Sequence, residues 1–154
     1  MNVEVHASTY GDPDVVTLIG EVQQEYVVRY GSEDATPMTP EEFVAPEGTV
    51  VVAYVDGGLA GCGAFRRHDA SIAEIKRMYV RPEHRGRGVA RAVLADLEAR
   101  ALAAGYTSIL LETGAKQPEA MALYASSGYA EAEPFGHYRC SPLSRSYAKD
   151  LPRA

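Results

Sequence analysis

The sequence predicts an α/β (α+β) fold in which a mixed, mostly antiparallel sheet is flanked by helices. Three observations lead to this prediction: strand-like runs at both ends of the chain, three β-rich runs in its centre, and segments of helical periodicity between them. The expected order is one strand, two helices, three strands, a helix, a strand, a helix and two final strands. A length of 154 residues with 46% hydrophobic composition suits one domain over residues 1–154.

The N-terminal part of the chain is predicted to hold one strand and two helices. "VEVHAS" alternates as a short strand does, and a helix is expected from about Pro13 to Arg29 because apolar residues recur there at helical spacing. In "MTPEEF", Thr39 is placed as an N-cap, Pro40 at the first helical position and Glu42 three residues after the cap. This capping-box start predicts a short second helix.

The rest of the chain alternates between strands and helices. The block from Gly48 to Val80 contains three β-rich runs separated by the turn formers "DGG" and "HDAS", which predicts an antiparallel meander. From Val89 an apolar helical face continues to Gly105, which is placed to end that helix. "TSILLE" is typical of a buried strand, and "PEAMALYASSG" opens and closes as a helix does. The segment from Tyr129 to Leu151 is predicted to form two strands joined by a long loop.

Composition and charge exclude several classes of protein. Fifteen Lys and Arg against 21 Asp and Glu give a formal charge of −6, which argues against a nucleic-acid partner and is compatible with a small amine substrate. No apolar run approaches the ~20 residues of a membrane span, and "MNVEVHASTY" lacks the form of a secretion signal, so we expect no membrane association and a cytoplasmic location. Cys62, Cys140 and four scattered histidines fit neither a disulfide framework nor a metal site.

The stretch "RPEHRGRGVARAV" places a basic, glycine-containing turn between a predicted strand and a predicted helix. Gly86 and Gly88 allow the backbone to approach a ligand, and the first turn of the helix from Val89 leaves its N–H groups unpaired. Such a helix start favours an anion, so the turn is a candidate pyrophosphate site reinforced by Arg85 and Arg87. It matches neither a Walker loop nor the G-x-G-x-x-G dinucleotide motif. A tight turn with solvated arginines is the alternative.

"RGRGVA" also resembles the Q/R-x-x-G-x-G/A signature of the GNAT superfamily of N-acetyltransferases, with Arg85, Gly88 and Ala90 at its defined positions. "MYVRPEHR" and "ALYASSGY" are similar to the end of that family's fourth strand and to its motif B, so the resemblance covers about residues 50–130. It implies the GNAT fold, acetyl-CoA as co-substrate and transfer of the acetyl group to an amine.

The resemblance also implies where acetyl-CoA binds. Backbone groups of Met78, Tyr79 and Val80 correspond to those that pair with the pantetheine arm. The pyrophosphate falls to the amides of the turn and first helical residues, which are Arg85, Gly86, Arg87, Gly88, Val89, Ala90 and Arg91. Gln117 stands where many relatives carry an asparagine that binds the same arm, and its longer side chain departs from that pattern.

Acetyl transfer to an amine needs a proton acceptor, because an aliphatic ammonium has a pKa of about 10.4 and cannot attack until it is deprotonated. Glu74 is the expected general base, since it lies six residues before Val80 at a position from which several GNAT enzymes use a glutamate. A strand period of two would place it on the face of Lys76, Met78 and Val80. An ion pair with Lys76 or Arg77, or a solvated side chain, is the alternative.

The departing thiolate benefits from a proton donor, and Tyr124 is the expected acid. "LYASSGY" matches the motif in which a helical tyrosine reaches the CoA sulfur, and a phenol with pKa near 10 is protonated at neutral pH. A tyrosine that only packs in the helix is the alternative.

Signals for the acceptor are weaker. Tyr26, Arg29 and Tyr30 could line the acceptor pocket by analogy of position, and Arg77 with "FRRH" could meet a substrate carboxylate, although a solvated hairpin fits equally well. Glu112, which ends "SILLE", could face the cleft, but a helix-capping or ion-pairing role is expected. No role is assigned to the loop 134–145.

Together these features predict an enzyme that moves the acetyl group of acetyl-CoA to a primary amine of a small-molecule or amino-acid-like acceptor, by direct attack in a ternary complex. Two alternatives stay open: a catalytically silent CoA-binding sensor module, and an N-acetyltransferase that modifies proteins. The oligomeric state is also open, with a homodimer as one alternative.

Overall fold

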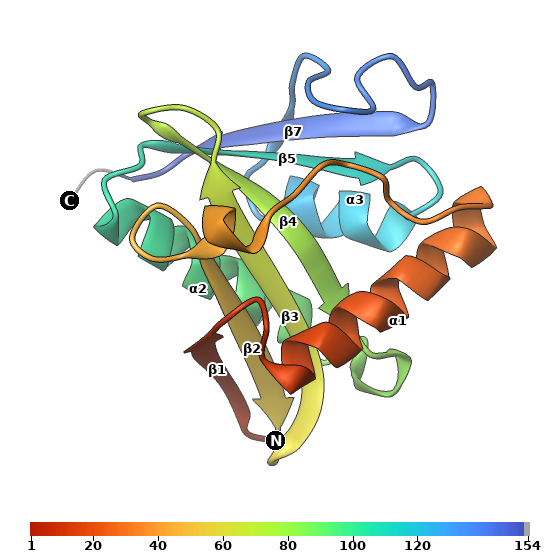
Figure 1. Ribbon diagram of the computed structural model, residues 1–154, viewed down its shortest axis with the longest axis vertical. Coiled ribbons are helices and arrows are strands. Elements are labelled where there is room, and N and C mark those ends of the chain that lie inside the picture. The colour runs from red at the N-terminus through yellow and green to blue at the C-terminus, as the bar shows by residue number, and fades with distance from the viewer. Residues whose placement is uncertain (153–154) are drawn as a thin grey trace.

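The computed structural model describes residues 1–152, which form one seven-stranded sheet with helices on both faces (Figure 1). The strands are β1 (Val3–Ser8), β2 (Thr49–Val55), β3 (Gly58–Arg67), β4 (Ile72–Val80), β5 (Ser108–Gly114), β6 (Ala130–Glu131) and β7 (Ser144–Asp150). The helices are α1 (Pro13–Tyr30), α2 (Val89–Ala103) and α3 (Pro118–Ser126), with 3₁₀ turns η1 (Pro40–Phe43) and η2 (Pro82–His84). In the order β1-β2-β3-β4-β5-β7-β6, all neighbours are antiparallel except β4 and β5. The predicted mixed, mostly antiparallel sheet is confirmed.

Two apolar cores lie on opposite faces of the sheet. On one face, α1 packs its buried residues against alternate side chains of β2, β3 and β4. On the other face, α2 and α3 cover a larger core that includes Ile75 of β4, Leu111 of β5 and Tyr124 of α3. Figure 1 shows the same arrangement, with α1 crossing one side of β3 and β4. The faces are separate because neighbouring residues of a strand point to opposite sides.

Strand β4 separates from β5 halfway along its length. The two pair in parallel only from Ile72 with Ser108 to Ile75 with Leu111, and Figure 1 shows them diverging beyond this point. The edge of β4 that faces β5 therefore has no strand partner from Lys76 onward. A strand edge without a partner presents backbone N–H and C=O groups that can bind an extended ligand.

A β-bulge lies in the same half of β4. Cys62 of β3 pairs with Tyr79 and Ala64 pairs with Lys76, so Gly63 alone faces both Arg77 and Met78. Arg77 adopts a φ of 59°, in the left-handed region that residues other than glycine seldom adopt. A Cβ on Gly63 would meet the Met78 sulfur at 2.8 Å, so the missing side chain makes room for the bulge.

The structure corrects one predicted element and confirms the others within a few residues. The second helix, expected from its capping box, is only a four-residue 3₁₀ turn, and no side chain caps it. Pro46 explains the difference, because proline disfavours helical conformation in the residue before it and leaves room for little more than one turn after Pro40. The helix predicted from Pro13 to Arg29 extends to Tyr30.

Candidate active site

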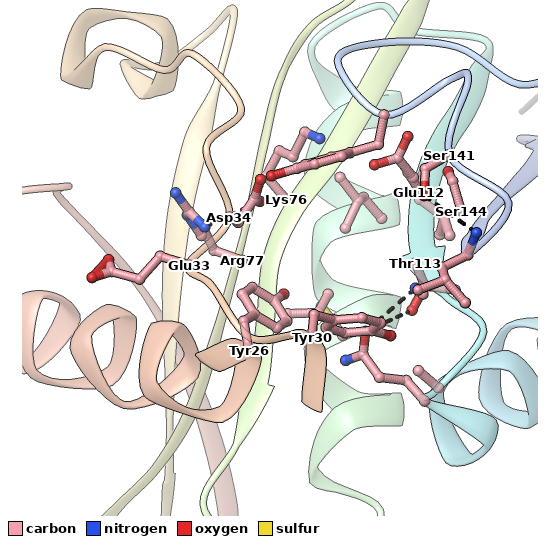
Figure 2. A pocket seen from close by; sticks show the side chains of 18 of the residues that line it. Tyr26, Tyr30, Glu33, Asp34, Lys76, Arg77, Glu112, Thr113, Ser141 and Ser144 are labelled. Carbon is pink, nitrogen blue, oxygen red and sulfur yellow. Dashed lines mark hydrogen bonds and ion pairs between the residues drawn. The ribbon is translucent and has the colours of Figure 1, made fainter. Parts of the chain in front are cut away.

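A cavity of about 290 Å³ lies where β4 and β5 separate (Figure 2). Because the sheet is open there, side chains from both of its faces border the same space. Tyr26 reaches it from α1, Tyr124 reaches it from α3, and Ile75 and Leu111 mark the last paired positions of the two strands. The segment after α1 and the loop before β7 close the remaining sides.

The bulge in β4 turns two consecutive cationic side chains toward this cavity. Lys76 Nζ lies 2.9 Å from Glu74 Oε2, and Arg77 Nη1 lies 3.3 Å from Asp34 Oδ2. The side chains of Lys76 and Arg77 are only 9% and 8% exposed. Arg77 Nε is buried and has no hydrogen-bond partner among the described residues. Both cations therefore lie beside the cavity with N–H groups to spare.

Glu74, the predicted base, does not line the cavity. One carboxylate oxygen accepts a hydrogen bond of 3.1 Å from Arg66 Nε, and the other forms the ion pair with Lys76. Arg66 also bonds to Glu42 at 2.8 Å, so the carboxylate of Glu74 belongs to a buried network beneath η1. The ion pair with Lys76 that the sequence offered as the alternative is present.

The predicted common face of Glu74, Lys76, Met78 and Val80 is half wrong. Met78 and Val80 pack with the core beneath α2, together with Ile75, which alternates with Glu74 and Lys76. The bulge adds one residue to β4 and so shifts the alternation of its side chains by one position. Even-numbered residues before the bulge, such as Glu74 and Lys76, therefore lie on the opposite face from even-numbered residues after it, such as Met78 and Val80.

Glu112 stands on the opposite wall, on β5, and Figure 2 shows it across the cavity from Arg77. Its Oε2 is buried and without a hydrogen-bond partner, and it forms no ion pair with any described residue. Burial raises the pKa of this carboxyl, although the charge of Lys76 and the neighbouring Ser144 hydroxyl oppose the shift. The helix-capping or ion-pairing role expected for Glu112 is therefore wrong, and the carboxylate faces the cavity instead.

Tyr124 lies at the α3 side of the cavity and is 5% exposed. Its ring packs on Tyr129 and Tyr147, with centroid distances of 5.8 and 6.0 Å. The hydroxyl makes no hydrogen bond within residues 1–152, and burial raises its pKa well above the usual value. The phenol therefore stays protonated and has its donor free.

Tyr26 and Tyr30 of α1 lie at the lower side of the cavity in Figure 2, and Gln117 borders the same cavity. Gln117 Oε1 accepts hydrogen bonds from the Tyr30 hydroxyl at 3.2 Å, from Thr113 Oγ1 at 3.4 Å and from the Gly114 amide at 3.3 Å. Tyr26 lies beside Tyr30 with a ring centroid distance of 6.3 Å. Tyr26, Tyr30 and Arg77, which are predicted for the acceptor, and Gln117, which is predicted for the cofactor arm, all border this one cavity.

Arg29 lies outside the cavity. Its Nη2 contacts Glu119 at 2.8 Å and Glu25 at 3.0 Å, and its Nη1 bonds to the Lys116 carbonyl oxygen. The side chain therefore fastens the end of α1 to the start of α3. Arg66 and Arg67, from "FRRH", also lie outside the cavity.

The loop between β6 and β7 borders the cavity. The Tyr138 hydroxyl accepts a hydrogen bond of 2.8 Å from the Ala35 amide, which joins this loop to the segment after α1. Tyr138, Ser141 and Ser144 all border the cavity. The loop 134–145, for which no role is predicted from the sequence, thus forms part of the cavity wall.

The glycine turn adopts the backbone that the sequence predicts. Gly86 and Gly88 have φ values of 77° and 80°, and Gly88 is the N-cap of α2 without a side-chain cap bond. A Cβ at either glycine would meet nothing within 4 Å, so these positions need glycine for their conformation rather than for space. The first-turn amides of α2 are left free for an anion.

The three arginines of the turn differ in their surroundings. Arg85 donates to the Val80 carbonyl oxygen and to Glu25, both at 2.9 Å, so it is held against α1. Arg91 donates to Ser126 and Ser127 at the end of α3. Arg87 is exposed and makes no side-chain bond to any described residue. Of the three, Arg87 is the one free to meet a bound phosphate.

Comparisons with known proteins agree with this architecture. The Acetyltransferase (GNAT) family model matches residues 17–129. This chain belongs to the GNAT acetyltransferase family. An IAA acetyltransferase from Azospirillum brasilense is 36% identical over 138 residues, which are 89% of this chain and 90% of that relative. The predicted GNAT membership is confirmed, and the protein is an acetyl-CoA-dependent N-acetyltransferase.

Solved GNAT structures share the fold. A protein from Klebsiella pneumoniae assigned as an acyl-CoA N-acyltransferase superposes with a TM-score of 0.79 at 29% identity, covering 97% of both chains. A GNAT family acetyltransferase from Elizabethkingia anophelis, solved with acetyl-CoA bound, gives a TM-score of 0.71 at 17% identity and covers 97% of this chain and 99% of its own. The second likeness shows the fold alone.

Other kinds of site find no support in the described residues. They contain no group of three or more His, Cys, Asp or Glu side chains arranged to hold a metal ion. None of their helices has the length and apolar character that crossing a membrane requires. Cys62 is buried, which raises the pKa of its thiol to about 12, and Cys140 is exposed on the loop before β7.

Sequence reasoning missed several residues that border the cavity of this GNAT enzyme. The positions of Lys76 and Asp34 at the cavity were not predictable from the sequence. The direction of the Lys76 side chain depends on the bulge in β4, and the place of Asp34 depends on the path of the irregular segment after α1. Glu112 carried a usable signal, a carboxylate that ends an apolar strand, but the commoner structural roles were preferred. Tyr138 lies in a loop without any recognisable motif.

Proposed function

We propose that this GNAT enzyme transfers the acetyl group of acetyl-CoA to a primary amine of a small-molecule or amino-acid-like acceptor, by direct attack in a ternary complex. One observation carries the proposal: the unpaired edge of β4, the free hydroxyl of Tyr124 and the unpartnered carboxylate of Glu112 all border one cavity. Acetyl-CoA supplies an acetyl group already activated as a thioester, so the protein has to align the amine and manage two protons.

The open edge of β4 supports the binding of the pantetheine arm. Backbone groups from Met78 to Val80 lie beyond the last pair with β5, where an extended chain can add to the sheet edge. Gln117 Nε2 has no hydrogen-bond partner among the described residues, so it can donate to the same arm. The Arg85 amide bonds to the Pro82 carbonyl oxygen, but the free amides from Gly86 to Arg91, at the start of α2, suit the pyrophosphate.

Tyr124 is proposed as the acid that donates a proton to the departing sulfur. Its hydroxyl has no competing partner, and its burial keeps it protonated. Burial of a thiolate in the same apolar surroundings raises the pKa of the thiol as well, so the raised pKa of the phenol does not by itself make the proton transfer more unfavourable.

A carboxylate is proposed as the base, and the geometry supports Glu112 over Glu74. Glu112 borders the cavity, has an oxygen without a partner, and has a raised pKa, which brings a carboxyl closer to the range useful for a base. Both oxygens of Glu74 are engaged by cations, Arg66 and Lys76, and Glu74 itself does not border the cavity. The role of Glu74 as the base remains a prediction from the sequence.

A small acceptor fits the enclosure better than a protein segment does. The bond between Tyr138 and Ala35 closes the loop before β7 over the cavity. An extended protein substrate would need this contact to open, whereas a small amine needs only the space beneath it.

The proposal is tested by measuring free thiol released from acetyl-CoA in the presence of a panel of small amines. We expect release with at least one amine, and acetylation of that amine by mass spectrometry. A CoA-induced rise in melting temperature without thiol release for any amine would contradict it and favour the silent CoA-binding module. Turnover with peptides but with no small amine would favour a protein acceptor.

A further inference from the structure

Buried polar atoms without partners gather at the cavity. Among residues 1–152, five buried side-chain nitrogen or oxygen atoms have no hydrogen-bond partner. Three of the five belong to residues that border this one space, namely Arg77 Nε, Glu112 Oε2 and Ser144 Oγ. A buried group without a partner loses its bonds to water without replacement, so such groups are few in native proteins. Their concentration at one cavity points to a ligand that satisfies them.

The two charged residues of this set, Arg77 and Glu112, have opposite charges and lie on opposite walls of the cavity. Figure 2 shows Lys76 and Arg77 on the β4 side and Glu112 on the β5 side. The β4 wall offers donors alone, because lysine and arginine have no acceptor. The opposite wall offers an acceptor at Glu112 of β5 and a hydroxyl at Ser144, the first residue of β7.

The known contacts of the two cations leave most of their donors unused. Lys76 Nζ makes one ion pair, with Glu74, and has three N–H groups. Arg77 uses Nη1 toward Asp34, which holds the segment after α1, and this structural role does not employ Nε. Arg66 already serves Glu74 from the other side, so Lys76 is not needed to neutralise that carboxylate alone.

We infer that the acceptor is an aminocarboxylate, with its ammonium at Glu112 and its carboxylate at Lys76 and Arg77. This inference rests on the proposed function and names its substrate class. A plain amine would satisfy Glu112 but leave the buried donor of Arg77 unpaired. A diamine would bring a second positive charge against the two cations of β4. An amino acid matches both walls, and the two contacts fix its amine in one orientation.

The test compares each of the twenty protein amino acids with its own carboxamide, which keeps the size and the amine but removes the negative charge. For the best amino acid, kcat/KM should exceed that of its amide by at least 10²-fold, because the amide leaves charged donors unpaired. Equal or better turnover of the amides would overturn this inference alone. Failure of all amines to release thiol would instead overturn the proposed function, and this inference with it.

Two variants locate the effect. Arg77→Gln and Lys76→Met should each lower kcat/KM for the amino acid at least tenfold more than for its amide, while the Kd for CoA stays within about twofold. Arg67→Gln is the matched control, since Arg67 is 51% exposed, pairs loosely with Glu47 at 3.8 Å and lies outside the cavity. A loss of CoA affinity without any change in the ratio of acid to amide would assign the two cations to the co-substrate and overturn the inference. Melting temperatures of the variants show whether each is folded, and the wild-type comparison stands without them.

Discussion

The Tyr30 hydroxyl donates a hydrogen bond to Gln117 Oε1 at 3.2 Å and joins α1 to α3 across the opening in the sheet. The two helices approach from opposite faces and meet only because β4 and β5 have separated. Gly114 completes the junction, because a Cβ there would overlap the Tyr30 hydroxyl. The wall of the cavity thus depends on a residue without a side chain.

Replacement of Gly114 by alanine should displace Tyr30 and loosen this junction. We expect a loss of about 1–3 kcal/mol in the free energy of unfolding, as for other overpacked sites, measured by denaturant titration. In a Tyr30→Ala background the same change should cost much less, since the space is then free. Gly20→Ala on α1 is the control, because nothing lies within 4 Å of its built Cβ and alanine favours a helix. Additive losses in the double variant would disprove the contact.

Gly88→Val should weaken CoA binding more than tenfold without unfolding the protein. The φ of 80° strains a β-branched residue, and relief of this strain turns the amides at the start of α2 away from the phosphate. Gly57→Val is a matched control, because Gly57 has a φ of 83°, equally open surroundings and a place in the distant β2–β3 hairpin. Calorimetry should show unchanged affinity for the control. If Gly88→Val bound CoA as tightly as Gly57→Val does, the turn would not be part of the CoA site.

Glu112→Gln tests the base that the geometry supports. Turnover should fall by about 10² or more, with CoA affinity nearly unchanged. In the wild type, kcat/KM should decline as the pH falls through the raised pKa of Glu112, above the value of about 4.3 for a solvated glutamate. The variant should lack this decline, and an identical pH profile would exclude Glu112.

The same substitution should not destabilise the fold at neutral pH. Because the pKa of Glu112 is higher in the folded than in the unfolded state, the folded protein binds its proton more tightly. Stability therefore falls as the pH rises through the window between the two values, and this deficit persists above it. Glutamine carries no such penalty, so Glu112→Gln should melt at a higher temperature than the wild type at pH 8 and lose that advantage below about pH 4.

Glu74→Gln, unlike Glu112→Gln, should destabilise the fold at neutral pH. The change leaves Arg66 and Lys76 buried with a weaker partner, and breaking a buried pair costs about 3 kcal/mol. Glu42→Gln, whose side chain is 38% exposed, touches the same Arg66 from the outside and should cost little. If Glu74 is nevertheless the base, as the sequence predicts, turnover per folded molecule falls by about 10² to 10⁴ and the low-pH limb changes.

Tyr124→Phe should separate packing from chemistry. The ring and its contacts stay, and the hydroxyl has no partner to lose, so stability should move by no more than about 1 kcal/mol while turnover falls about 10-fold or more. Tyr129→Phe is the control, because its hydroxyl bonds to Glu98 at 2.7 Å away from the cavity. That variant should lose stability and keep its activity per folded molecule. A reversed pair of results would make Tyr124 a structural residue.

Patterns local to the chain were predictable from the sequence. Helical spacing gave α1, α2 and α3 nearly to the residue, because an apolar face repeats every three to four positions whatever lies opposite it. Gly86 and Gly88 are predictable as the turn before α2 as well. A left-handed φ depends on a single residue, and glycine adopts it without strain. The tyrosine of "LYASSGY" was identified from its motif and does border the cavity.

Relations between strands were decided only by the tertiary structure. The sequence by itself determined an acetyltransferase fold, the glycine turn before α2 and the place of Tyr124 on a helix. The bulge at Arg77 depends on Gly63 in the neighbouring strand, and it alone determines that Lys76 and Arg77 face one side while Met78 faces the other. The exposure of Glu112 to the cavity likewise follows from the point at which β4 leaves β5. The pairing register depends on residues far apart in the chain. It therefore cannot be predicted from the alternation of apolar and polar residues within one strand.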